Sequence, residues 1–272
     1  MTTAGALVRA CHPEPALAVT LIAGALAVGT DAPVLRVMAA FGAGQLATGW
    51  SNDWIDRDRD ARSGRGDKPL VAGRLPAATL RIAALLAAVA CVPLSLALGV
   101  RAGLVHLAAV GSALAYNVGL KAGPLSWLPY AVSFGLLPSV VVLASPGGGL
   151  APAWATAAGA LLGVGAHLAN ALPDLEDDLA NGVRGLPHRL GRPMSSAMAA
   201  VLLLAATTLL AYGPGSPGTY GFVALVVATL LTAGGVGLAR RPGSRAAFLA
   251  AVAVAVVDVS LLVARGAQLT GG

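Results

Sequence analysis

Apolar residues run along most of the chain in long stretches, which short polar segments separate. Stretches of roughly 17–25 mostly apolar residues are typical of helices that cross a membrane. Nine such stretches lie at residues 14–30, 33–52, 77–99, 101–118, 125–144, 151–173, 194–212, 217–238 and 244–266. The alternation of apolar and polar residues that is typical of membrane barrels is absent. The pattern therefore predicts an all-α polytopic membrane protein with about nine transmembrane helices.

The composition supports a membrane location and argues against an ordinary soluble domain. Charged residues make up 11% of the 272 residues and hydrophobic residues 57%, whereas about 25% of the residues in soluble domains are charged. No long polar linker divides the chain, so we expect residues 1–272 to form one integral membrane domain, with the first apolar run retained rather than cleaved as a signal peptide. Cys11 and Cys91 have no motif spacing, so we expect neither a zinc site nor a disulfide.

The basic residues predict how the helices are oriented in the cell membrane. With nine spans, the N-terminus and the even-numbered connections lie on one side, and that side holds 15 of the 18 basic residues. The remaining three are Arg36, Arg101 and Arg265. Because cytoplasmic loops carry an excess of lysine and arginine, the crowded side is expected to be cytoplasmic. The net charge of +6 is thus explained without a nucleic-acid partner.

The acidic residues gather at the cytoplasmic ends of two predicted spans. Nine of the twelve acids lie in two windows, 53–67 and 174–178. Each window contains two aspartates of a polar trio whose members are spaced four apart, and an asparagine before the window completes the trio. The trios are Asn52, Asp56 and Asp60, and Asn170, Asp174 and Asp178. Residues at this spacing fan over only about 80° of a helix surface. If the helices continue that far, each trio forms one polar stripe, and the repeat suggests two four-helix halves plus a ninth helix around a central cavity.

Two facing stripes would bring about four carboxylates together, and their repulsion implies a bound cation. Oxygen ligands without histidine suit Mg²⁺ or Ca²⁺, and Mg²⁺ commonly binds one or two carboxylates together with substrate phosphate. Bases that can hold a phosphate lie around both windows: Arg57, Arg62, Arg65, Lys68, Arg74, Lys121, Arg184 and Arg189. A lipid phosphate, with its tail between the helices, is the predicted ligand. An EF-hand loop does not fit, because Ala61 stands where its turn needs glycine.

Four sequence motifs together resemble the UbiA superfamily of intramembrane prenyltransferases. The string Asn52-Asp53-x-x-Asp56-x-x-x-Asp60 resembles the first signature of the family, and "PDLEDD" resembles its second aspartate-rich motif. The stretches "KPLVAGRLP" (68–76) and "YNVGLK" (116–121) resemble the basic segment and the tyrosine–lysine element of the family. The segment "VRGLPHRLG" departs from the family pattern, because Gly185 stands where threonine is frequent.

The resemblance implies a site for Mg²⁺ and an isoprenyl diphosphate. The metal ligands that it implies are Asp53, Asp56, Asp60, Asp174, Asp177 and Asp178. The implied diphosphate-binding residues are Asn52, Arg65, Lys68, Tyr116, Lys121, Asn170 and Arg184. Asp56, Asp60, Asp174, Asp178 and Lys121 are the implied catalytic residues. Roles for Arg9, His12 and His167 are left open, and Asp258 is expected to be a buried hydrogen-bond partner rather than a catalytic base.

The implied reaction is transfer of a prenyl group, through an allylic cation, to a lipophilic acceptor within the membrane. A terpene cyclase of the same superfamily is an alternative, because it shares both motifs and uses the double bonds of the prenyl chain instead of an acceptor. A transporter with charged gates is a second alternative outside the enzymes. Trp50 and Trp54 flank the first asparagine and either shape a pocket or anchor the helix at the membrane interface.

Overall fold

Helices account for nearly all of the chain in a computed structural model, which describes residues 2–62, 64, 66–180, 182–238 and 246–270. Within these residues there are twelve α-helices and one short 3₁₀ helix, and no strands. The helices are α1 (Thr3–Ala10), α2 (Pro13–Gly29), α3 (Val34–Arg62), α4 (Ala77–Leu96), α5 (Val100–Val118), η1 (Leu120–Ala122), α6 (Leu128–Ala144), α7 (Ala153–Ala171), α8 (Leu175–Ala180), α9 (Leu186–Tyr212), α10 (Gly218–Leu238), α11 (Ala246–Ala264) and α12 (Gly266–Leu269). The predicted all-α class is confirmed.

A long helix lies at each of the nine apolar runs, but their lengths and compositions differ. The helices α4, α9, α10 and α11 are each long and apolar enough to cross a membrane, and α1 with α2 forms a further candidate bent by 65°. Large apolar side chains on their outer surfaces are exposed, including Leu86 and Val89 on α4 and Phe222 on α10. Such surfaces suit lipid rather than water. The chain is therefore an integral membrane protein, while the count of nine spans stays a prediction.

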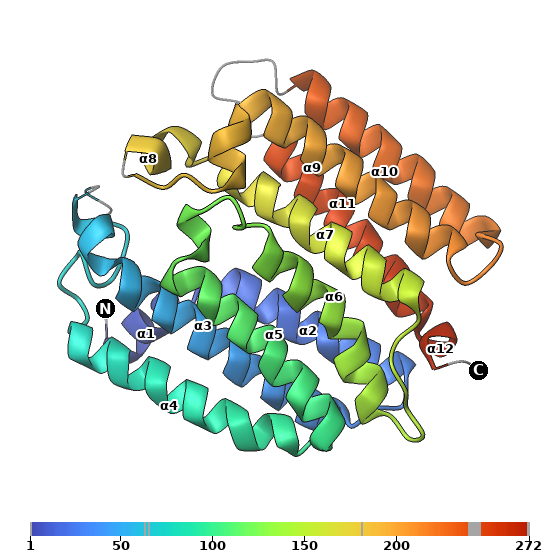
Figure 1. The fold of residues 1–272 in the computed structure, drawn as a ribbon, viewed down its shortest axis with the longest axis horizontal. Coiled ribbons are helices and arrows are strands. Elements are labelled where there is room, and N and C mark those ends of the chain that lie inside the picture. The colour runs from blue at the N-terminus through green and yellow to red at the C-terminus, as the bar shows by residue number, and fades with distance from the viewer. Residues whose placement is uncertain (1, 63, 65, 181, 239–245, 271–272) are drawn as a thin grey trace.

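Helices that follow one another in sequence pack side by side, and α11 packs against both α2 and α7 to close the bundle (Figure 1). Glycines allow a close approach between α6 and α7. A Cβ atom added at Gly159 would lie 2.5 Å from the carbonyl oxygen of Phe134, and one at Gly163 would lie 2.4 Å from that of Tyr130. Small residues of this kind let membrane helices pack backbone against backbone.

The two polar trios differ in how their helices continue. Helix α3 runs without interruption from Val34 to Arg62, so the first trio forms the expected stripe on one helix. Helix α7 instead ends at Ala171, and Asp178 lies on the separate six-residue helix α8. Pro173 stands at this break, and proline has no amide hydrogen with which to continue a helix. The expectation of one continuous second stripe is therefore wrong.

Candidate functional site

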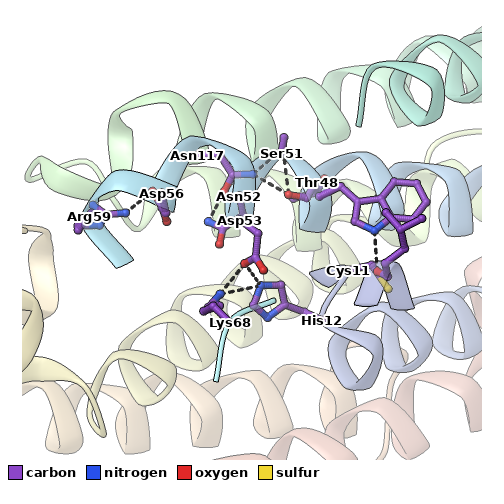
Figure 2. A network of polar contacts seen from close by, with 12 residues as sticks. Cys11, His12, Thr48, Ser51, Asn52, Asp53, Asp56, Arg59, Lys68 and Asn117 are labelled. Atoms are coloured by element: carbon purple, nitrogen blue, oxygen red, sulfur yellow. Dashed lines mark hydrogen bonds and ion pairs between the residues drawn. The ribbon is translucent and has the colours of Figure 1, made fainter. Parts of the chain in front are cut away.

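The first polar stripe meets α5 through Asn52. The Asn52 side-chain amide donates to the Asn117 side-chain oxygen over 3.0 Å. Asn117 in turn donates to the carbonyl oxygen of Thr48 over 2.8 Å and to the Ser51 hydroxyl over 3.0 Å (Figure 2). These bonds fix the C-terminal half of α3 against the end of α5. Sequence reasoning missed Asn117, although it is the neighbour of Tyr116 in the quoted "YNVGLK" stretch.

One turn further along the stripe, Asp56 lies between two cations. Its carboxylate forms ion pairs with Lys121 and with Arg59. Lys121 belongs to η1, directly after α5, and its side chain is buried. Burial lowers the pKa of Lys121 below its ordinary value, and the negative charges of Asp56 and Asp60 oppose that effect. The structure thus pairs Asp56 with Lys121, two of the residues predicted to be catalytic, and a third, Asp60, lies one turn further along α3.

Asp53 lies on the same helix but contacts different partners. Its Oδ1 atom is 2.8 Å from Nε2 of His12 and 2.5 Å from Nζ of Lys68 (Figure 2). Burial of the Asp53 carboxylate raises its pKa. Hydrogen bonds from His12 and Lys68 and their positive charges outweigh that burial, so the pKa of Asp53 is held below its ordinary value. Lys68, which was expected to bind diphosphate, therefore pairs with Asp53 in this structure.

The second motif lies on α8 and the turn before it. Asp178 places Oδ2 at 3.3 Å from Nε2 of His188, while Asn170 and Asp174 are exposed. Glu176 accepts two hydrogen bonds from the Arg192 guanidinium, over 3.1 and 2.5 Å, which tie α8 to α9. The Asp177 side chain lies outside the part of the chain that the structure describes.

Of two further predicted diphosphate ligands, the structure describes Arg184 but not Arg65. Arg184 is exposed, and its carbonyl oxygen accepts a 2.9 Å hydrogen bond from Nε of Arg189. Arg65 lies outside the described residues, so its predicted role stays a prediction.

Tyr116, a predicted diphosphate ligand, lies near the end of α5 in a group of rings from α5, α6 and α7. The Tyr116 ring packs edge-on against Tyr130 and His167, with ring centroids 5.3 and 5.8 Å apart. The end of α3 and helix α8 also lie at the same end of the bundle, opposite α12 (Figure 1). The two motifs, which are remote in sequence, therefore lie at the same end of the bundle (Figure 1).

A buried serine joins three segments beside this tyrosine. Ser126 Oγ lies 3.0 Å from Nε2 of His167 on α7 and accepts a 2.8 Å hydrogen bond from the backbone amide of Leu186. Gly185 packs so tightly that an added Cβ would lie 2.6 Å from the Lys121 carbonyl oxygen. The glycine that replaces the usual threonine of the family thus lets the segment before α9 approach η1. No sequence signal pointed to Ser126.

The structure shows the surroundings of three residues whose roles the sequence did not decide. Arg9 is exposed on α1. Asp258 is buried on α11, where its Oδ1 accepts a 2.6 Å hydrogen bond from Thr207, as expected for a buried hydrogen-bond partner. Trp50 donates from its indole to the Leu7 carbonyl oxygen over 2.9 Å, which anchors it to α1.

The donor chemistry of the two motifs fits a hard divalent cation. Among the residues that the structure describes, no three acidic, histidine or cysteine side chains lie close enough to hold one ion by themselves. Mg²⁺ does not need such a cage, because it commonly takes one or two carboxylates and completes its shell with water and substrate phosphates. Asp56 with Asp60, and Asp174 with Asp178, offer that number of carboxylates on each side, with Lys121 and Arg59 supplying positive charge nearby.

The chain is similar in sequence pattern and fold to one group of proteins. The pattern of the UbiA prenyltransferase family matches residues 15–263. A UbiA homologue from Archaeoglobus fulgidus bound to GPP and Mg²⁺ has a TM-score of 0.73 at 17% identity, over 98% of this chain and 100% of that chain. A UbiA homologue from Aeropyrum pernix K1 in its apo form has a TM-score of 0.71 at 20% identity, over 92% and 98%. The structure of a digeranylgeranylglyceryl phosphate synthase gives 0.67 at 17% identity, over 97% of each chain. None of the curated proteins matches the chain.

Proposed function

We propose that this chain, which belongs to the UbiA prenyltransferase family, transfers a prenyl group from an isoprenyl diphosphate to a lipophilic acceptor within the membrane, with Mg²⁺ as cofactor. The observation that carries the proposal is the packing of Gly185, in the segment that follows the second motif, against the carbonyl oxygen of Lys121 in η1. The pairing of Asp56 with the buried Lys121 adds a cation at the same place. The Archaeoglobus homologue with GPP and Mg²⁺ supports both the donor and the metal.

Each group of residues then has a defined task. Asp56 and Asp60 would hold Mg²⁺ on the α3 side, and Asp174 and Asp178 would hold it on the α8 side. When bound, Mg²⁺ stabilises the negative charge that develops on the diphosphate as it leaves the allylic carbon. Lys121 adds a fixed positive charge for the same leaving group, and Asn52 orients the first stripe through Asn117.

The apolar interior protects the allylic cation after the diphosphate has left. The rings of Tyr116, Tyr130 and Phe134 lie in sequence from the motifs into the bundle, and Tyr130 stacks on Phe134 with centroids 6.3 Å apart. Aromatic faces stabilise a cation, and a dry environment prevents water from capturing it. The prenyl group is then available to an acceptor that enters from the membrane.

Release of diphosphate by the purified protein tests this function. Geranylgeranyl diphosphate is supplied with Mg²⁺ and a panel of acceptors: an aromatic acid, a quinone precursor, a tetrapyrrole and a glycerol lipid. Asp56→Asn and Asp174→Asn should each lower the release rate by at least about 100-fold, because each removes a carboxylate that stabilises the metal-bound leaving group. Asp58→Asn, on the exposed face of α3, is the matched control and should keep the wild-type rate.

The products separate the remaining alternatives. A terpene formed from the donor alone would identify a cyclase, and the absence of diphosphate release with every donor and acceptor would exclude an enzyme and favour a transporter. Wild-type turnover by Asp56→Asn or Asp174→Asn would overturn the assignment of the metal ligands. The folded state of each variant is checked by gel filtration and thermal unfolding in detergent.

A further inference from the structure

Three polar residues that are remote in sequence meet on the C-terminal half of α3. His12, Asp53 and Lys68, here called the Asp53 clamp, share one carboxylate oxygen, and Nζ of Lys68 also lies 3.3 Å from Nε2 of His12 (Figure 2). The Asp53 side chain is only 3% exposed and that of Lys68 only 14%. A charge pair this well shielded from water is costly to break, because removing one partner leaves the other buried and unpaired.

The His12 end of the clamp is the elbow between α1 and α2. His12 has a φ of 55°, a left-handed conformation that residues other than glycine rarely adopt, and the two helices diverge there by 65°. The elbow lies directly on α3, because a Cβ atom at Gly49 would be 2.4 Å from the carbonyl oxygen of Cys11. The hydrogen bond from Trp50 to Leu7 holds α1 on the same part of α3.

The Lys68 end of the clamp begins a compact turn that leads to α4. The amides of Ala72 and Arg74 donate to the carbonyl oxygens of Lys68 and Pro69, each over 2.9 Å. Residues of this turn and of the start of α4 form a small apolar cluster with residues of α1 and α3. Its members are Ala6, Ala10, Leu75 and Leu80, with Leu7, Trp50, Trp54 and Leu70 packed against them. The clamp therefore lies where α1, α3 and the 68–76 segment come together.

Asp53 and Asp56 are one turn apart but have different surroundings. Asp56 pairs with Lys121 of η1, whereas Asp53 pairs with His12 at the elbow and with Lys68 of the 68–76 segment. A metal ion at the Oδ1 atom of Asp53 would have to displace an ammonium group and an imidazole from that oxygen. The Oδ1 atom of Asp53 thus joins two other segments of the chain to α3.

We propose that Asp53 is a positioning residue and not a metal ligand: through His12 and Lys68 it fixes the α1–α2 elbow and the 68–76 segment on α3, beside Asn52 and Asp56. This inference rests on the proposed function only where it contrasts Asp53 with the metal-binding carboxylates. The clamp itself is a property of the folded chain without substrate, so it can be tested separately.

Cys11 provides a direct reporter of the clamp, because it is buried at the elbow and the chain has only one other cysteine. In a Cys91→Ala background, the rate at which a membrane-impermeant maleimide labels Cys11 is followed by intact mass. Asp53→Asn should speed labelling by roughly tenfold or more, the scale expected for loss of a charge-assisted hydrogen bond. Lys68→Met should also speed the labelling of Cys11, although Lys68 is distant from Cys11 in sequence. The double variant should label no faster than the faster single variant.

Asp58→Asn is the matched control on the exposed face of α3 and should leave the labelling rate unchanged. Gly49→Ala tests the elbow independently, since its added methyl group would push Cys11 away without altering any charge. Labelling of Asp53→Asn at the rate of Asp58→Asn would overturn the proposal. This measurement needs no substrate, so its outcome does not depend on whether the chain transfers prenyl groups.

The Mg²⁺ dependence of turnover distinguishes positioning from metal binding. Asp53→Asn and Lys68→Met should each lower kcat, should not lower it additively, and should leave the Mg²⁺ concentration for half-maximal rate unchanged. Asp56→Asn should raise that concentration or abolish turnover. If Asp53→Asn raises the Mg²⁺ requirement as Asp56→Asn does, Asp53 is a metal ligand and the proposal fails. If the wild type has no turnover, the proposed function fails while the labelling result still decides the role of the clamp.

Discussion

The chemical role of each residue at this site depends on what lies opposite it. Asp53 and Asp56 are the same residue type on one helix, yet their partners come from different parts of the chain: His12 and Lys68 for one, Lys121 for the other. The four-residue spacing of the sequence indicated Asn52, Asp56 and Asp60, because the spacing alone places residues on one helix face. It could not assign Asp53, because its partners depend on an elbow at His12 that no periodic pattern predicts.

The Cys11 thiol gives a pH prediction at the residue scale. Burial raises the pKa of Cys11, and a backbone hydrogen bond opposes that effect only in part. The thiolate is the form that reacts with maleimide, so a raised pKa leaves less of it at any given pH. In the Cys91→Ala protein, the labelling rate should therefore rise at higher pH than in the same protein unfolded in detergent. Superimposable rate–pH curves for the two states would contradict this.

At the scale of elements, glycine and proline decide how the helices meet. The apolar runs predicted the positions of all nine long helices, because a membrane helix needs a long apolar stretch that is visible in the sequence. The runs did not predict α1, η1, α8 or α12, which are too short to leave such a pattern. The break before α8 was missed because the polar spacing continued through Pro173, although the helix did not.

Close packing of α6 on α7 gives a prediction for Gly163. An alanine there would bring its methyl group to 2.4 Å from the Tyr130 carbonyl oxygen, so the two helices would have to move apart. Gly163→Ala should therefore destabilise the protein by about 1–3 kcal/mol, measured as a lower midpoint of thermal unfolding in detergent. Gly111→Ala on α5 is the control, because its methyl group meets nothing within 4 Å. An equal midpoint for both variants would show that this contact is not tight.

At the scale of the whole molecule, the distribution of basic residues and the position of the two motifs predict how the protein is oriented in the membrane. In the sequence, 15 of the 18 basic residues fall on the side that is predicted to carry both aspartate-rich motifs. In the structure, α1, the end of α3 and α8 lie at the same end of the bundle (Figure 1). Positive charge is retained in the cytoplasm during insertion, so this end is expected to face the cytoplasm. The substrate diphosphate would then come from the cytoplasmic side, while its prenyl chain enters the apolar bundle.

Cysteine accessibility in intact cells tests the orientation. In a protein without Cys11 and Cys91, a single cysteine replaces either Arg74, at the motif end, or Gly149, between α6 and α7; both positions are exposed. Gly149→Cys should react with a membrane-impermeant maleimide in intact cells, and Arg74→Cys only after the membrane is permeabilised. The reverse pattern would place the motifs on the outer side of the membrane.

The central claim is that carboxylates from two remote segments hold one metal–diphosphate headgroup together. Electron paramagnetic resonance of Mn²⁺, used as a probe for Mg²⁺, counts the ions bound to the purified protein with and without a slowly cleaved geranylgeranyl thiolodiphosphate. The account predicts that tight Mn²⁺ binding requires the analogue and is lost in both Asp56→Asn and Asp174→Asn. Undiminished binding in either variant would show that the two motifs do not share a ligand, and would contradict the account.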